Sequence, residues 1–206
     1  ELAGLKPHAQ MTGKSLANIL RSDKSGWVEN RDTMLAGKER HDIGRPNDLG
    51  YPVRALRTRD FLYVHNFHPD RWPVGNPETD FGNCDPGPSK EVLKLLGGHF
   101  YELCFGKRQP DELYDLRRDP QAVNNLAGDL ALREKMEDLR YRMMQMLRDE
   151  QDTRALGEAA IFDTDKYVGG RGKGYETWLK AQEEKLAAEL KAKLEASPAK
   201  RARQAR

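Results

Sequence analysis

DELYDLRRDP, at residues 111–120, decides the fold together with the NNLA that follows at residues 124–127. Polar and apolar residues alternate from Glu112 to Leu116, which is typical of a strand with one face buried and one face in solvent. Asp119-Pro120 favours a turn, and Asn124 or Asn125 can cap the start of a following helix. The stretch therefore predicts a strand, a turn and a helix start.

The predicted helix runs from about Leu130 to Arg148. Its apolar residues recur at steps of three and four, so they share one face: Leu132, Met136, Leu139, Met143 and Leu147. Such a stripe is core far more often than it is a cofactor site. Upstream, Val53–Thr58 and Phe61–Asn66 predict a β-hairpin, and Asp32–Ala36 predicts a short strand. A small sheet packed on one helix is the expected core.

Two regions are predicted to be loops, and one further helix follows them. Prolines and glycines recur from Phe67 to Lys90, and glycines again from Gly157 to Gly174. A Lys/Glu-rich helix is predicted from Tyr175 to about Ala196. It carries a narrow apolar stripe made of Leu179, Leu186, Leu190 and Leu194.

Composition limits the classes of function. The 206 residues carry a net charge of +2. From Lys180 to Arg206 basic residues outnumber acidic ones by eight to four, so the rest of the chain is slightly acidic. That distribution argues against a nucleic-acid partner. No apolar run approaches the roughly 20 residues that span a bilayer. Cys84 and Cys104 could form one bridge or remain packed thiols.

Three motifs resemble one enzyme family. The pattern ELYDLxxDPxxxxNLA is similar to a signature near the C-terminus of type I sulfatases. GKSLANIL, at residues 13–20, resembles their G-x-S-L-x-P-L-L element. YPVRALRTRDFLYVHNFHPDRWP, at residues 51–73, is similar to a hairpin and loop of the heparan N-sulfatase-like and related glycosaminoglycan sulfatases. The motifs occur in the family's order, and the resemblance covers about residues 2–168.

The resemblance implies an α/β fold of the alkaline-phosphatase-like sulfatase type. Residues 1–45 would end the catalytic domain, and residues 46–168 would form the C-terminal subdomain, a small antiparallel sheet packed on a helix. Residues 169–206 would be a glycine-rich linker and a charged helical tail. The chain would then be the C-terminal part of a sulfuric ester or sulfamate hydrolase whose N-terminal half lies upstream.

The family's nucleophile is a formylglycine made from a C/S-x-P-S-R motif, and it lies beside a calcium ion. Cys84-Asp85-Pro86-Gly87-Pro88 has Gly and Pro where the family has Ser and Arg, so Cys84 is interpreted as a loop cysteine. The resemblance places calcium and formylglycine in the missing N-terminal part and implies that this chain alone is inactive. It also implies a periplasmic or extracellular location and a sulfated saccharide as substrate.

Candidate substrate-binding residues fall into two groups. Lys38, Arg40 and His41 follow a predicted strand, where α/β sheets place their ligands, and a surface charge cluster is an equally open interpretation. His68 and Trp72 lie in the proline-rich loop and could hydrogen-bond or stack on a saccharide. Arg57 and Arg59 are expected to pair with carboxylates. The alternative function is a non-catalytic interaction module that uses the C-terminal amphipathic basic helix.

Overall fold

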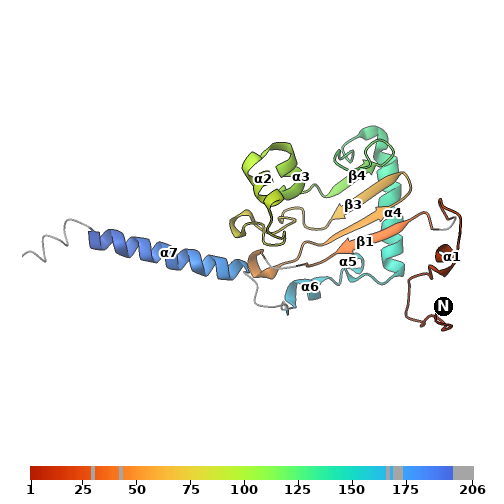
Figure 1. Cartoon of the computed structure of the whole chain (residues 1–206), viewed down its shortest axis with the longest axis horizontal. Coiled ribbons are helices and arrows are strands. Elements are labelled where there is room, and N and C mark those ends of the chain that lie inside the picture. Colours follow the sequence, from red (N-terminus) through yellow and green to blue (C-terminus); the bar gives the residue numbers. More distant parts are fainter. Residues whose placement is uncertain (29–30, 42–43, 166–167, 169–173, 197–206) are drawn as a thin grey trace, which may run out of the picture. The chain divides into compact units, whose positions relative to one another are not determined.

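The computed structural model describes residues 1–28, 31–41, 44–165, 168 and 174–196. Its strands are β1 (Met34–Lys38), β2 (Val53–Arg57), β3 (Phe61–Asn66) and β4 (Asp111–Asp115). They form one antiparallel sheet in the order β1-β2-β3-β4 (Figure 1). The fold is therefore mixed α/β with a small antiparallel sheet, as predicted, and the hairpin of β2 and β3 is confirmed.

The helices fall into a few long elements and several single turns. The longest are α2 (Pro88–Leu96), α3 (Gly98–Phe105), α4 (Arg133–Asp149) and α7 (Tyr175–Ala196). The short ones are α1 (Ala17–Leu20), α5 (Thr153–Leu156), α6 (Ala160–Thr164) and the 3-10 turns η1 (Pro46–Asp48), η2 (Pro77–Thr79) and η3 (Leu130–Leu132). Among the residues described, no helix is long and apolar enough to cross a membrane.

The chain forms two compact units from interleaved segments. The first unit consists of Glu1–Ala36, Ala55–Val64 and Glu112–Glu158. The second consists of Gly37–Arg54, His65–Asp111 and Ala159–Arg206. The predicted divisions at residues 45 and 168 remain predictions.

The core of the first unit lies between the sheet and α4 (Figure 1). Leu56 on β2, Tyr63 on β3 and Leu113 on β4 are fully buried. Leu139, Met143 and Leu147 of α4 meet them, while Leu132 and Met136 pack at the edge of the same cluster. The stripe predicted for this helix is therefore the core, as expected. Burying each of these large side chains contributes about 1.5–3 kcal/mol before the entropy cost of ordering the chain.

Strand β4 differs from its prediction, because it has no solvent-facing side. Glu112, Leu113, Tyr114 and Asp115 are each at most 7% exposed. The Tyr114 hydroxyl donates to the Glu112 carboxylate, and Asp115 pairs with Arg117. Polar residues on this strand are thus buried with partners, which a period of two in the sequence cannot distinguish from exposure.

The expected helix cap at Asn124 or Asn125 is wrong. The Asn125 side-chain oxygen instead accepts hydrogen bonds of 2.9 Å from the backbone N–H groups of Leu113 and Ala127, so it fastens the turn to β4. The helical segment begins after Asp129, whose carboxylate accepts from the Ala131 N–H. An asparagine offers the same acceptor to a turn as to a helix end, and here the turn takes it.

The second unit contains α2 and α3, which lie side by side (Figure 1) and were not predicted. Phe81 stacks on Phe105 with ring centroids 4.6 Å apart and meets Tyr101 edge to face at 6.0 Å. Beneath the loop, the buried Lys90 ammonium group donates to the carbonyls of Asp80, Phe81 and Cys84. This lysine holds a largely irregular loop in place, and Cys84 and Cys104 are free thiols.

Two further expectations are corrected. The segment 157–174 is not wholly loop, because α6 forms within it, and part of that prediction lies outside the described residues. Within the described ranges, neither Arg57 nor Arg59 forms an ion pair, and Arg59 instead lies over the Trp27 ring at 5.9 Å. On β2 the arginine that pairs is instead Arg54, 2.8 Å from Glu39. The long helix α7 has the predicted bounds.

Candidate functional site

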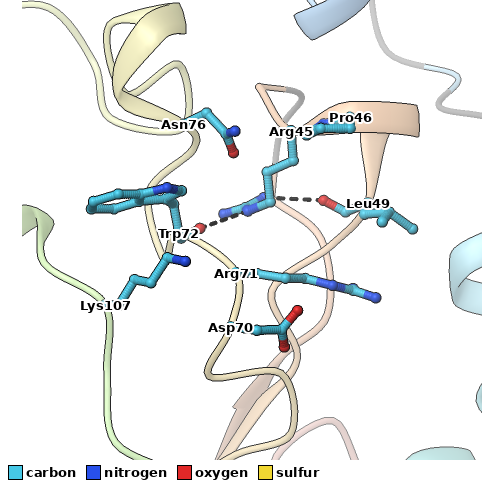
Figure 2. Close-up of a pocket in the computed structure, with 8 residues that line it drawn as sticks. All are labelled: Arg45, Pro46, Leu49, Asp70, Arg71, Trp72, Asn76 and Lys107. Atoms are coloured by element: carbon cyan, nitrogen blue, oxygen red, sulfur yellow. Dashed lines mark hydrogen bonds between the residues drawn. The ribbon is translucent and has the colours of Figure 1, made fainter.

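The second unit contains a pocket of about 360 Å³ whose lining is rich in cations (Figure 2). Its walls come from the loop before β2, the loop after β3 and the segment after α3. The lining residues are Arg45, Pro46, Leu49, Asp70, Arg71, Trp72, Asn76 and Lys107. The lining contains three basic side chains and one acidic side chain, so it favours an anionic ligand.

Arg45 forms the floor and is only 3% exposed. Its Nε donates to the Trp72 carbonyl at 2.7 Å, and one Nη donates to the Leu49 carbonyl at 3.2 Å (Figure 2). The other Nη donates to the Pro73 carbonyl at 2.8 Å. Burial, followed by the charge of nearby Arg71, lowers the pKa of Arg45 to about 10. The guanidinium therefore stays charged at neutral pH. It satisfies three backbone acceptors and fixes both loops.

Arg71 has fewer of its hydrogen-bond donors occupied by protein acceptors than Arg45 has. Its Nη1 donates to the Gly50 carbonyl at 2.9 Å and lies 3.4 Å from the Asp163 carboxylate. In the part of the chain that the structure describes, its Nε and Nη2 have no hydrogen-bond partner. The side chain is 14% exposed. Arg71 thus offers donors to a ligand from a position that protein contacts already fix.

Lys107 and Trp72 form the opposite wall. The Lys107 ammonium group lies over the Trp72 ring, 5.4 Å from its centroid. Apart from that ring, it has no polar partner among the described residues. The Trp72 ring meets Phe81 edge to face at 6.3 Å, which ties this wall to the aromatic cluster. The Lys107 charge therefore adds, beside this aromatic wall, a cation with which an anionic ligand can pair.

Close backbone approaches shape the loops around the pocket. Gly75 has φ +91°, and a Cβ there would lie 2.9 Å from the Gly82 nitrogen. The Gly44 carbonyl accepts from the Asn76 N–H at 2.8 Å and from the Thr79 hydroxyl at 3.2 Å. Any side chain at Gly75 would therefore displace Gly82 and distort the loop that presents Trp72.

Of the residues predicted from sequence, Trp72 lines the pocket and Lys38 lies near it. Lys38 ends β1, and its pKa is lowered by desolvation of the ammonium group and then by the charge of Arg45. Arg40 donates to the carbonyls of Asp48 at 3.2 Å and Asp165 at 3.0 Å. His41 is exposed, and His68 lies 3.8 Å from the Asp70 carboxylate. Arg40, His41 and His68 are not among the lining residues.

Sequence reasoning missed Arg45 and Lys107. Arg45 precedes Pro46, which favours an extended backbone at Arg45, and the observed φ of −125° and ψ of 157° agree. An arginine before a proline predicts an extended loop residue, but it does not predict that the arginine is buried. Lys107 follows the unpredicted helix α3, so its position could not be inferred. Arg71 stood in the proline-rich loop beside Trp72, and its proximity to Arg45 arises only from the tertiary fold.

Within the described residues, no group of three or more His, Cys, Asp or Glu side chains is arranged to hold a metal ion. Cys84 lies in a loop, with its sulfur 3.8 Å from the Asp85 carbonyl oxygen.

Comparisons with known proteins give only partial likenesses. No protein-family model matches the chain, and no curated protein matches it. Among solved structures, the chain is similar to a protein of Bacteroides thetaiotaomicron provisionally assigned as a sulfatase. Their identity is 19% and the TM-score is 0.45, with 74% of this chain and 23% of the other covered.

Two further solved structures are similar over a comparable length. One is a complex with its substrate D-glucosamine-2-N,6-O-disulfate, at 16% identity and a TM-score of 0.45, covering 80% of this chain and 24% of that chain. The other is a 2-O GAG sulfatase, at 17% identity and a TM-score of 0.47, covering 85% and 29%. The chain thus spans about a quarter of the length of these structures.

Proposed function

We propose that this chain is the C-terminal part of a sulfatase that acts on a sulfated saccharide, and that its basic pocket holds an anionic group of that saccharide. Three sequence motifs in the family's order support the first part of the proposal. The charge and chemistry of the pocket support the second part, because three of its lining residues are basic (Arg45, Arg71 and Lys107) and only Asp70 is acidic.

One observation carries the proposal: the pocket is lined by cationic donors with no protein partner in the described ranges, and one of them, the Lys107 ammonium group, lies over an aromatic ring. Arg71 offers Nε and Nη2, and Lys107 offers its ammonium group above Trp72. A sulfate group accepts such charge-assisted hydrogen bonds, and the C–H face of a sugar ring packs on an indole. A sulfated sugar has both features, whereas inorganic sulfate has only the first.

The reaction itself would require the remainder of the protein. The proposal assigns formylglycine and calcium to that remainder, where they would supply the nucleophile and stabilise the sulfate oxygens. This chain would contribute substrate binding and would be inactive alone. The proposal also includes a periplasmic or extracellular location.

Lys38, Arg40, His41 and His68 remain candidates for the rim of the substrate site. Lys38 and His41 are both exposed, Lys38 at the end of β1 and His41 on the chain that follows it. Loss of one hydrogen bond to a charged group costs about 1.5–3 kcal/mol. His41→Ala is therefore expected to lower kcat/KM on a saccharide by roughly tenfold to a hundredfold, with little effect on a small aryl sulfate.

The test of the proposal is sulfate release by the complete protein that contains this chain, with Lys107→Ala as the variant. Lys107 donates to no described protein group, so its removal leaves no protein acceptor without a partner. We expect kcat/KM to fall roughly tenfold or more on a sulfated saccharide and to change little on a small aryl sulfate. Arg118→Ala, at an exposed turn, is the control. Equal rates on the saccharide for Lys107→Ala and wild type would contradict the proposal.

A further inference from the structure

Helix α7 is held at its first turn and is exposed beyond it. The Asn47 backbone N–H donates to the Glu176 carboxylate at 2.6 Å, which fastens the start of α7 to η1 (Figure 1). From Leu179 to Ala196 every residue is exposed, and the leucines are 41–67% exposed. A single helix without tertiary contacts is only marginally stable in water, so this length of exposed helix is expected to have a partner.

The exposed face has the spacing of a coiled coil. Leu179, Glu183, Leu186, Leu190 and Lys193 follow one another at steps of four, three, four and three. That is the 3.5-residue period at which two helices bury a continuous seam. Three seam positions are leucine, and the two charged positions have opposite signs. Charged residues within a seam specify which partner and which orientation are allowed.

We propose that α7 pairs antiparallel with α7 of a second copy of this chain, with the two helices crossing at the level of Ala188. In that register Leu186 faces the partner subunit's Leu190. The same register sets Glu183 opposite the partner subunit's Lys193. By symmetry each contact occurs twice, so every charge in the seam meets its opposite. A parallel pair would instead set Glu183 against the partner's Glu183 and Lys193 against the partner's Lys193.

The charge along the whole helix favours the same orientation. From Tyr175 to Glu184 there are three acidic residues and one basic residue, whereas from Lys185 to Ala196 there are three basic residues and two acidic ones. An antiparallel partner brings the acidic half of one helix beside the basic half of the other. This complementarity favours a second copy over an unrelated partner, because α7 itself contains both the acidic half and the basic half that an antiparallel pair brings together.

Sedimentation of the full chain over a concentration series tests the proposal. Wild type is expected to show a reversible dimer. Glu183→Lys and Lys193→Glu each replace both attractive pairs with repulsive ones, so each is expected to weaken dimerisation roughly tenfold or more. The double variant Glu183→Lys/Lys193→Glu restores both pairs and should recover the wild-type dissociation constant. Because all these positions are exposed, the variants should fold normally.

The orientation follows from the same measurements. In a parallel pair a single charge swap would leave two like-charge contacts, as in wild type, so the dissociation constant would hardly change. Glu195→Lys makes the same change of charge as Glu183→Lys on the face away from the seam, and it should dimerise like wild type. The proposal is overturned if wild type is monomeric at every concentration, if Glu195→Lys weakens dimerisation as much as Glu183→Lys, or if the double variant fails to recover.

Discussion

Arg45 Nε donates a 2.7 Å hydrogen bond to the backbone carbonyl of Trp72, which joins the buried floor of the pocket to its aromatic wall. The other two bonds of the same guanidinium reach Leu49 and Pro73, so one side chain holds two loops together. The pocket is therefore built before any ligand arrives, which lowers the entropy cost of binding.

Arg45→Ala is expected to lower the free energy of unfolding by roughly 3 kcal/mol or more, because buried acceptors left without donors cost about 1–3 kcal/mol each. The free energy of unfolding of Arg45→Lys should lie between those of wild type and Arg45→Ala, since a single ammonium group cannot reproduce the planar fork of the guanidinium. Denaturation by urea measures both. The exposed Arg118→Ala should stay within about 0.5 kcal/mol of wild type. A wild-type midpoint for Arg45→Ala would show that Arg45 does not hold these loops.

Lys90→Met should loosen the loop that Lys90 supports. The ammonium group donates to the carbonyls of Asp80 and, at 2.9 Å, of Cys84, so its loss removes the donor from both acceptors, whereas the Phe81 carbonyl keeps the Cys84 N–H. We expect a loss of about 3 kcal/mol and faster amide hydrogen exchange at Asn83 and Cys84. Lys94→Met, which removes only a surface pairing, should cost less than about 1 kcal/mol. Unchanged amide hydrogen exchange at Asn83 and Cys84 in Lys90→Met would show that Lys90 does not hold this loop in place.

Asn125→Ala is expected to cost about 2 kcal/mol, since it removes the acceptor of two backbone N–H groups, those of Leu113 and Ala127. Asn125→Asp keeps an oxygen at that position and should retain most of the stability. Asn124→Ala is the matched control, and its side chain is exposed. Thermal melts of the three variants would decide the matter, and equal losses at both positions would contradict the assignment.

Asp115 should make stability depend on pH in acid. Hydrogen bonds from Arg117 hold the pKa of Asp115 below its ordinary value of 3.8. Because the folded pKa is the lower one, the contribution is complete above about pH 4 and is lost as the pH falls through the folded pKa. Asp115→Asn should therefore be less stable than wild type at pH 6, with the difference shrinking below pH 4. Asp138→Asn, on an exposed part of α4, should show no such convergence. A constant difference for Asp115→Asn down to pH 2 would argue against the pair.

The sequence predicts the parts of this fold that repeat with a period. The stripe from Leu132 to Leu147 and the hairpin of β2 and β3 were correctly identified, because one buried face imposes its spacing on the residues. The bounds of α7 were also correct. Helices α2 and α3 were missed, since the Gly97-Gly98 pair and the exposed Leu95 and Leu96 interrupt any simple apolar stripe.

The pocket was less predictable for a different reason. Trp72 stood out as an aromatic residue in a proline-rich loop, but Arg45 and Lys107 lie 27 residues before it and 35 after it in the sequence. Only tertiary structure brings them together. Arg45 also shows why charge in a sequence does not report exposure, because it is buried on backbone carbonyls.

The most direct test of the central claim is a calorimetric titration of the 206-residue chain with a sulfated hexosamine disaccharide and with its unsulfated counterpart. We expect measurable binding of the sulfated sugar that weakens as salt is added, little binding of the unsulfated sugar, and at least roughly tenfold weaker binding by Lys107→Ala. Equal affinity for the two sugars, or full affinity in Lys107→Ala, would contradict the assignment of this pocket to a sulfated saccharide.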